Sequence, residues 1–101
     1  MHIISESRLK QFWTKHANSK SALQAWYKIA TQEKWRGIDD VRKTFPSADP
    51  VGNLTVFNIG GNNYRLITFI DYNFNKIFIR ACLTHAEYDK GNWKKESWDE
   101  S

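Results

Sequence analysis

The stretch YRLITFIDYNFNKIFIRACLT, residues 64–84, decides the fold because it contains two strands separated by a tight turn. Apolar, aromatic and β-branched residues dominate both halves, as in strands that cover a core. The letters NFNK at 73–76, with two asparagines, mark the turn between them. We predict strands over Tyr64–Tyr72 and Lys76–Thr84, antiparallel because their connection is short.

A third strand precedes this pair. Residues 54–59 are apolar and β-branched, and the GGNN that follows at 60–63 is a turn signal. The three segments therefore predict an antiparallel three-strand meander over residues 54–84.

The register of the second hairpin determines which side chains share a face. With a four-residue loop, Tyr72–Asn75, the facing pairs are Ile70 with Ile77, Thr68 with Ile79 and Leu66 with Ala81. We assign this mostly apolar face to the helices. The opposite face, predicted to be free of helices, then carries Arg65, Ile67, Phe69, Phe78, Arg80 and Cys82. Two arginines are thus expected close together on that open face.

The N-terminal half predicts a short strand at HIIS, residues 2–5, and then helices. A first helix has an apolar stripe with helical spacing, with Ser5 as its N-cap, and a second begins at a capping box of Ser21 and Gln24 and ends near Gly37. The stripes are Leu9, Phe12, Trp13 and His16, and Ala22, Trp26, Ile29 and Ala30. The letters DDVRKTF predict a short third helix ended by Pro46, followed by a loop over 46–53.

Helices grouped before a meander predict an α+β domain. We expect the N-terminal strand and two helices to pack on one face of a mainly antiparallel sheet. A chain of 101 residues, 41% of them hydrophobic, is long enough for one core. We therefore predict a single domain over residues 1–91 and a polar C-terminal tail over 92–101, a candidate for disorder.

The charge distribution favours a polyanionic partner. The last six residues, ESWDES, hold three of the eleven acidic residues and none of the fifteen basic ones, so residues 1–95 carry a net charge of +7. Equally basic domains also occur with no such partner. The polar N-terminus is unlike a signal peptide, no apolar run reaches membrane-spanning length, and the single Cys82 excludes an internal disulfide. The expected location is the cytoplasm.

Ionisable side chains gather after the last strand, in THAEYDK at 84–90. His85 has an ordinary pKa near 6.5 and can act as acid or base. Thr84 and Glu87 have the spacing of a capping box, so the same residues also describe an ordinary capped helix. Arg65 and Arg80 suit phosphate oxygens, although each could instead form a surface ion pair.

The sequence predicts no cofactor and no metal site. The three histidines lack ligand spacing, and no glycine-rich phosphate loop precedes a helix. Cys82 lies within a strand and is interpreted as a core residue rather than a nucleophile.

The segments DVRKTFPSAD, VFNIGGNNYRLI and IRACLTHAEYDK closely resemble the HigB-type toxins of bacterial toxin–antitoxin pairs, over roughly residues 22–90. The resemblance implies a RelE-like fold and an mRNA interferase that cuts mRNA, commonly on the ribosome. It also implies inhibition by a cognate antitoxin with a helix-turn-helix domain, of the HigA type.

Metal-free RNA cleavage uses the substrate's 2′-hydroxyl as nucleophile and needs a base, an acid and cations for the phosphorane charge. The resemblance implies that Arg65 and Arg80 supply cations and that His85 moves a proton. Tyr88 and Lys90 are candidates for the second proton position, and which group is base or acid stays open. Further candidates for contacts with RNA are Lys43, Asn58 and Lys76.

Two other functions remain possible from the sequence. One is a toxin of the same fold that acts on a protein such as DNA gyrase, as the ParE-like branch does. The other is a non-catalytic module that binds RNA or the ribosome.

Overall fold

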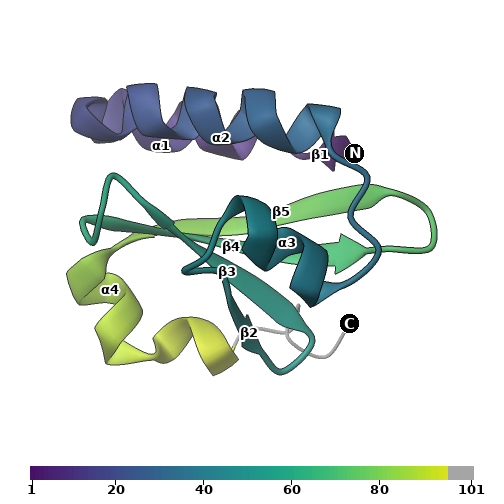
Figure 1. The fold of residues 1–101 in the computed structure, drawn as a ribbon. Helices are drawn as coiled ribbons and strands as arrows, with labels where there is room; N and C mark the ends of the chain where they lie inside the picture. The colour runs from purple at the N-terminus through teal and green to yellow at the C-terminus, as the bar shows by residue number, and fades with distance from the viewer. Residues whose placement is uncertain (96–101) are drawn as a thin grey trace.

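The computed structural model describes residues 1–95 and contains one mixed five-stranded sheet (Figure 1). The strands lie in the order β1-β5-β4-β3-β2. Their bounds are β1 His2–Ile4, β2 Asp49–Val51, β3 Leu54–Ile59, β4 Tyr64–Asp71 and β5 Lys76–Thr84. Strand β1 runs parallel to β5, and the other neighbours are antiparallel. The predicted α+β class and the meander are confirmed.

Three helices cover one face of the sheet: α1 Ser7–Lys15, α2 Lys20–Gln32 and α3 Ile38–Thr44. In Figure 1, α1 and α2 form a layer above the strands. Leu9 of α1 and Trp26 of α2 are buried against the sheet. The ring centroids of Trp26 and of Phe57 in β3 lie 5.3 Å apart. Burial of apolar side chains along one stripe of each helix therefore fixes this layer. Among residues 1–95, no helix has the length and apolar character that crossing a membrane requires.

The opposite face is not free of helices, contrary to our expectation. Helix α4, His85–Lys90, and the 3-10 turn Asn92–Lys95 fold back beneath the sheet (Figure 1). Trp93, only 4% exposed, packs in a second hydrophobic cluster with Leu54, Val56 and Ile67. Packed structure thus continues past residue 91, and the rest of the expected tail, 96–101, lies outside the described residues.

The predicted register of the second hairpin is right near its turn and wrong beyond Thr68. Ile70 pairs with Ile77 and Thr68 with Ile79, as expected, but Ile67 then pairs with Ala81. Arg80 is an extra residue in β5, which makes this a β-bulge.

The bulge changes which face receives the following side chains. Leu66 pairs with Cys82 and not with Ala81. Cys82 therefore packs toward the helices, whereas Ala81 lies in the second cluster. Our assignment of these two residues to faces is reversed.

Smaller differences concern caps and edges. The segment 46–53, expected to be a loop, contains the edge strand β2. Glu6, not Ser5, is the N-cap of α1, and Ser5 has a positive φ of 69°. Helix α2 begins at Lys20 without a side-chain cap, so the expected capping box at Ser21 is wrong.

Candidate active site

The junction of β5 and α4 is fixed by a capping box, as the sequence predicts. The Thr84 hydroxyl accepts a hydrogen bond from the Glu87 backbone N–H at 3.2 Å, and the Glu87 carboxylate accepts from the Thr84 N–H at 2.9 Å. The bond from the Thr84 N–H is the main reason why the pKa of Glu87 is lowered. Helix α4 ends at Lys90, and its C-cap Gly91 has a φ of 73°, a conformation that glycine adopts without strain. These caps hold the six residues of α4 at the end of the sheet.

Arg65 of β4 lies against this helix and is only 9% exposed. Its Nη1 donates to the backbone carbonyls of Asn62 and Tyr64, both at 3.1 Å. Its Nη2 lies 3.2 Å from Nδ1 of His85. The guanidinium thus ties the β3–β4 turn to the first residue of α4.

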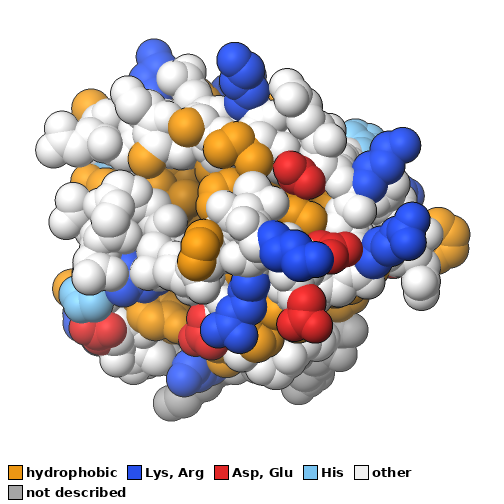
Figure 2. All heavy atoms as spheres, viewed as in Figure 1, with side chains coloured by type: hydrophobic (Ala, Val, Ile, Leu, Met, Phe, Trp, Pro, Cys, Tyr) orange, Lys and Arg blue, Asp and Glu red, His pale blue; other side chains and the backbone are white. Residues whose placement is uncertain are grey.

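The contact with Arg65 favours one tautomer of the neutral His85 ring. A guanidinium can only donate, so Nδ1 of His85 must accept and the ring carries its proton on Nε2. Nε2 lies 3.1 Å from Oδ2 of Asp89, one helical turn further. Both side chains are about half exposed, at 52% and 60%. Figure 2 shows a histidine side chain beside an acidic one over α4.

Tyr88 faces the sheet rather than solvent. Its ring stacks on that of Trp93, with the two centroids 5.0 Å apart. The Arg65 guanidinium lies 5.4 Å from the centroid of the Tyr88 ring. Burial is the main cause that raises the pKa of Tyr88, with Asp49 adding to it and Arg65 opposing it. The phenol therefore keeps its proton at neutral pH. Lys90 is exposed in the last turn of α4.

Arg65 and Arg80 do not form the expected neighbouring pair. Arg65 pairs with Leu83, which lies three residues and roughly 10 Å beyond Arg80 along β5. The Arg80 guanidinium lies 5.8 and 5.5 Å from the ring centroids of Phe69 and Phe78. The bulge separates the two guanidinium groups into different surroundings.

The three residues suggested for RNA contacts lie in different places. Asn58 pairs with Arg65 across β3 and β4 and therefore lies beside the site. Lys76 begins β5, eight residues and roughly 26 Å from Thr84. Lys43 is 81% exposed on α3, with Nζ 3.9 Å from Asp40. Of these three residues, only Asn58 adjoins Arg65 in the sheet.

His16 is a second histidine near the site, and the sequence interpretation treated it as a packing residue only. Its ring stacks on Phe12 at 4.5 Å and lies 5.9 Å from Tyr64, the strand partner of Thr84. Its positive form also helps to lower the pKa of Glu87. No sequence pattern links residues 16 and 87; folding of α1 against the sheet brings them together.

The part of the chain that the structure describes offers neither a cluster of metal ligands nor a reactive thiol. Among residues 1–95, no three His, Cys, Asp or Glu side chains are grouped to hold a metal ion. Burial raises the pKa of Cys82 to about 12, so its thiol stays protonated at neutral pH.

Comparison with known proteins shows to which family this chain is similar. Residues 19–91 match the HigB_toxin family, described as the RelE-like toxic component of a toxin–antitoxin system. The mRNA interferase HigB of Escherichia coli O6:H1 (strain CFT073) is 31% identical over 93 residues, 89% of this chain and 90% of that protein. The mRNA interferase toxin HigB of Escherichia coli K12 is 32% identical over 92 residues, 88% of each chain.

This small α+β domain, with basic and ionisable side chains at the end of its last strand, is a RelE-like toxic component of a toxin–antitoxin system. Within that class the chain belongs to the HigB toxin family.

Proposed function

We propose that this toxin is an mRNA interferase, an endoribonuclease that cleaves mRNA on the ribosome without a catalytic metal ion. It acts in the cytoplasm, where its substrate is, and a HigA-type antitoxin with a helix-turn-helix domain neutralises it. The resemblance to the two Escherichia coli relatives, both named as mRNA interferases, supports the activity. The observation that carries the mechanism is the chain of contacts Arg65–His85–Asp89.

In this row of contacts, His85 is a general base whose lone pair is blocked until RNA binds. Its Nδ1 lone pair faces the Arg65 guanidinium and is therefore occupied. A phosphate anion entering beside it attracts the guanidinium, which offers a fork of donors for phosphate oxygens. Nδ1 is then free to take the proton of the ribose 2′-hydroxyl. Asp89, on Nε2–H, stabilises the imidazolium that forms.

The 2′-oxygen attacks the adjacent phosphorus as its proton passes to His85, and the bond from phosphorus to the 5′-oxygen breaks. Arg65 balances the negative charge on the phosphorane. The leaving 5′-oxygen takes a proton from Tyr88 or Lys90. Burial keeps the Tyr88 phenol protonated, which is the state an acid needs. The products are a 2′,3′-cyclic phosphate and a 5′-hydroxyl end.

The remaining candidates act on RNA at a distance from the scissile bond. Asn58 adjoins Arg65 and can hydrogen-bond the same nucleotide. Arg80 lies nearer the start of β5 and contacts the RNA at a nucleotide away from the reacting phosphate. Lys43 and Lys76 contribute positive charge that attracts RNA.

The decisive experiment incubates purified toxin with mRNA and translating ribosomes and maps cuts by primer extension. We expect discrete cuts within coding sequence, with 2′,3′-cyclic phosphate ends. Cuts that appear on free RNA should persist in chelator, and loss of those cuts would contradict the metal-free mechanism. Ribosome binding without any cut would instead identify a non-catalytic module.

A growth experiment tests the partner. Expression of the toxin alone should arrest bacterial growth, and co-expression with an antitoxin gene adjacent to the toxin gene should restore it. If growth and translation are unaffected although the protein is verifiably expressed, the protein does not inhibit translation and the proposed mRNA cleavage is contradicted.

A further inference from the structure

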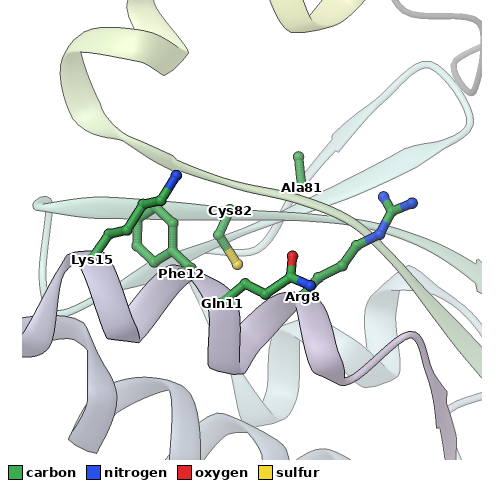
Figure 3. Close-up of a pocket in the computed structure, with 6 residues that line it drawn as sticks. All are labelled: Arg8, Gln11, Phe12, Lys15, Ala81 and Cys82. Carbon is green, nitrogen blue, oxygen red and sulfur yellow. The ribbon is translucent and has the colours of Figure 1, made fainter.

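A cleft of about 440 Å³ lies between α1 and β5, outside the Arg65–His85–Asp89 chain. Figure 3 shows its six lining residues, with Arg8 and Lys15 at opposite ends and Cys82 between them. The set is Arg8, Gln11, Phe12 and Lys15 from α1 and Ala81 and Cys82 from β5. None of these six described residues is acidic, and two are permanently or mainly cationic at neutral pH.

The cleft exists because β1 is short. Strand β1 pairs only with residues 76–78 of β5, and the chain then leaves the sheet to form α1. Helix α1 lies along the next part of β5 instead of a strand. Its Arg8 donates from Nη1 to the backbone carbonyl of Arg80, the extra residue of the bulge. The cleft therefore has one helical wall and one wall made by a strand edge.

The cleft leads to the candidate active site. His16 follows Lys15 and stacks on Phe12 of the cleft wall, and its ring centroid lies 5.9 Å from that of Tyr64, the strand partner of Thr84. Cys82 on the other wall is two residues before Thr84, the N-cap of α4. A polymer lying in the cleft would reach His85 at the end nearer Lys15.

We propose that this cleft binds single-stranded RNA next to the scissile phosphate, which extends the proposed function to a second RNA subsite. Arg8 and Lys15 lie on one helix face, seven residues or about 10 Å apart, and each neutralises a backbone phosphate. Phe12 on the helical wall and Ala81 on the strand wall provide apolar surface that a base can cover, and Gln11 can hydrogen-bond to that base. An extended polyanion with apolar bases matches this combination of charge and apolar surface.

The test measures binding of a single-stranded RNA over a series of salt concentrations, with the ribose at the cleavage position replaced by 2′-deoxyribose. For single strands, each phosphate contact contributes about 0.7 to the slope of log affinity against log salt. Lys15→Gln should reduce the slope by about 0.7, and Arg8→Gln with Lys15→Gln by about 1.4. The matched control is Lys10→Gln, which lies on the same helix but lines a different cleft, and it should leave the slope unchanged.

Thermal melting of each variant separates binding from folding, and Lys15→Gln alone keeps the test valid if the Arg8 variant unfolds. Slopes equal to that of the wild type in a protein that still cleaves mRNA would overturn this inference and leave the proposed function intact. Absence of cleavage by the wild type would contradict the proposed function separately. Loss of antitoxin binding with an unchanged RNA slope would overturn the inference by identifying the cleft as a surface for an acidic protein.

Discussion

Nη2 of Arg65 and Nδ1 of His85 lie 3.2 Å apart, and this contact joins a buried strand residue to an exposed helix residue. The guanidinium holds the imidazole in one tautomer and covers the lone pair that catalysis would use. Arg65 therefore has two tasks in the proposed mechanism, orienting the base before RNA binds and neutralising phosphate afterwards.

Substitution of Arg65 by lysine keeps the charge and removes the fork of donors. We expect a loss of cleavage of a hundredfold or more, because transition-state charge loses a preorganised donor. We also expect a loss of stability of about 1–3 kcal/mol, because the carbonyls of Asn62 and Tyr64 lose their partner. NMR of the ring nitrogens should show that His85 no longer occupies only the Nε2–H tautomer. If His85 keeps a single tautomer in Arg65→Lys, the Arg65 guanidinium does not orient the base. If cleavage stays normal, its fork of donors is not needed to neutralise the phosphate.

Removal of the proposed base tests proton transfer directly. His85→Gln keeps hydrogen bonding but cannot take up a proton, so cleavage should fall by about 10²–10⁴. The side chain is about half exposed, so the melting temperature should change little. His2→Gln is the matched control, since His2 is exposed at the opposite end of the sheet, paired with Lys76. Near-normal cleavage by His85→Gln would move the role of base to another residue.

The capping box makes part of the stability depend on pH. The folded-state pKa of Glu87 is lowered, so its contribution is present above the ordinary glutamate pKa and is lost as pH falls through the lowered value. Chemical denaturation across a pH series should therefore show wild type and Glu87→Gln converging in acid. Thr84→Ala, which removes the N-cap, should cost about 0.5–2 kcal/mol at neutral pH. A stability difference between wild type and Glu87→Gln that is constant with pH would contradict this assignment.

Trp93 tests whether the second hydrophobic cluster supports the site. Trp93→Ala should cost about 3–5 kcal/mol, because a nearly fully buried ring is lost. Tyr88 loses its stacking partner, so cleavage should fall as well. Asn92→Ala is a control in the same 3-10 turn with an exposed side chain. Equal melting temperatures for Trp93→Ala and wild type would mean that residues 92–95 contribute little to the fold.

Local patterns made most of the elements predictable from the sequence. Runs of apolar and β-branched residues bounded by turn signals gave the bounds of β3 and β5, and the spacing of Thr84 and Glu87 gave the start of α4. The edge strand β2 was not predictable because it is three residues long and contains Pro50. Proline is tolerated there because an edge strand leaves one side unpaired.

The site was less predictable because its contacts cross the fold. Sequence proximity brings His85 and Asp89 together, but Arg65 and His16 reach α4 only through the sheet and α1. The bulge at Arg80 has no local signal, since arginine is an ordinary strand residue. Its presence separates the two arginines that a regular hairpin would have placed diagonally opposite.

The extra residue in β5 also makes the length of this strand a constraint on evolution. Before Arg80, the odd-numbered residues of β5 face the three N-terminal helices, whereas after Arg80 the even-numbered residue Cys82 does so. The apolar side chains on both sides of the bulge are therefore buried correctly only while the extra residue is kept. A single-residue deletion between Arg80 and Thr84 would exchange the environments of Ala81, Cys82 and Leu83 and rotate the attachment point of α4. Substitutions in this segment should therefore be tolerated far more often than changes of length, and a two-residue change should be less harmful than a change of one.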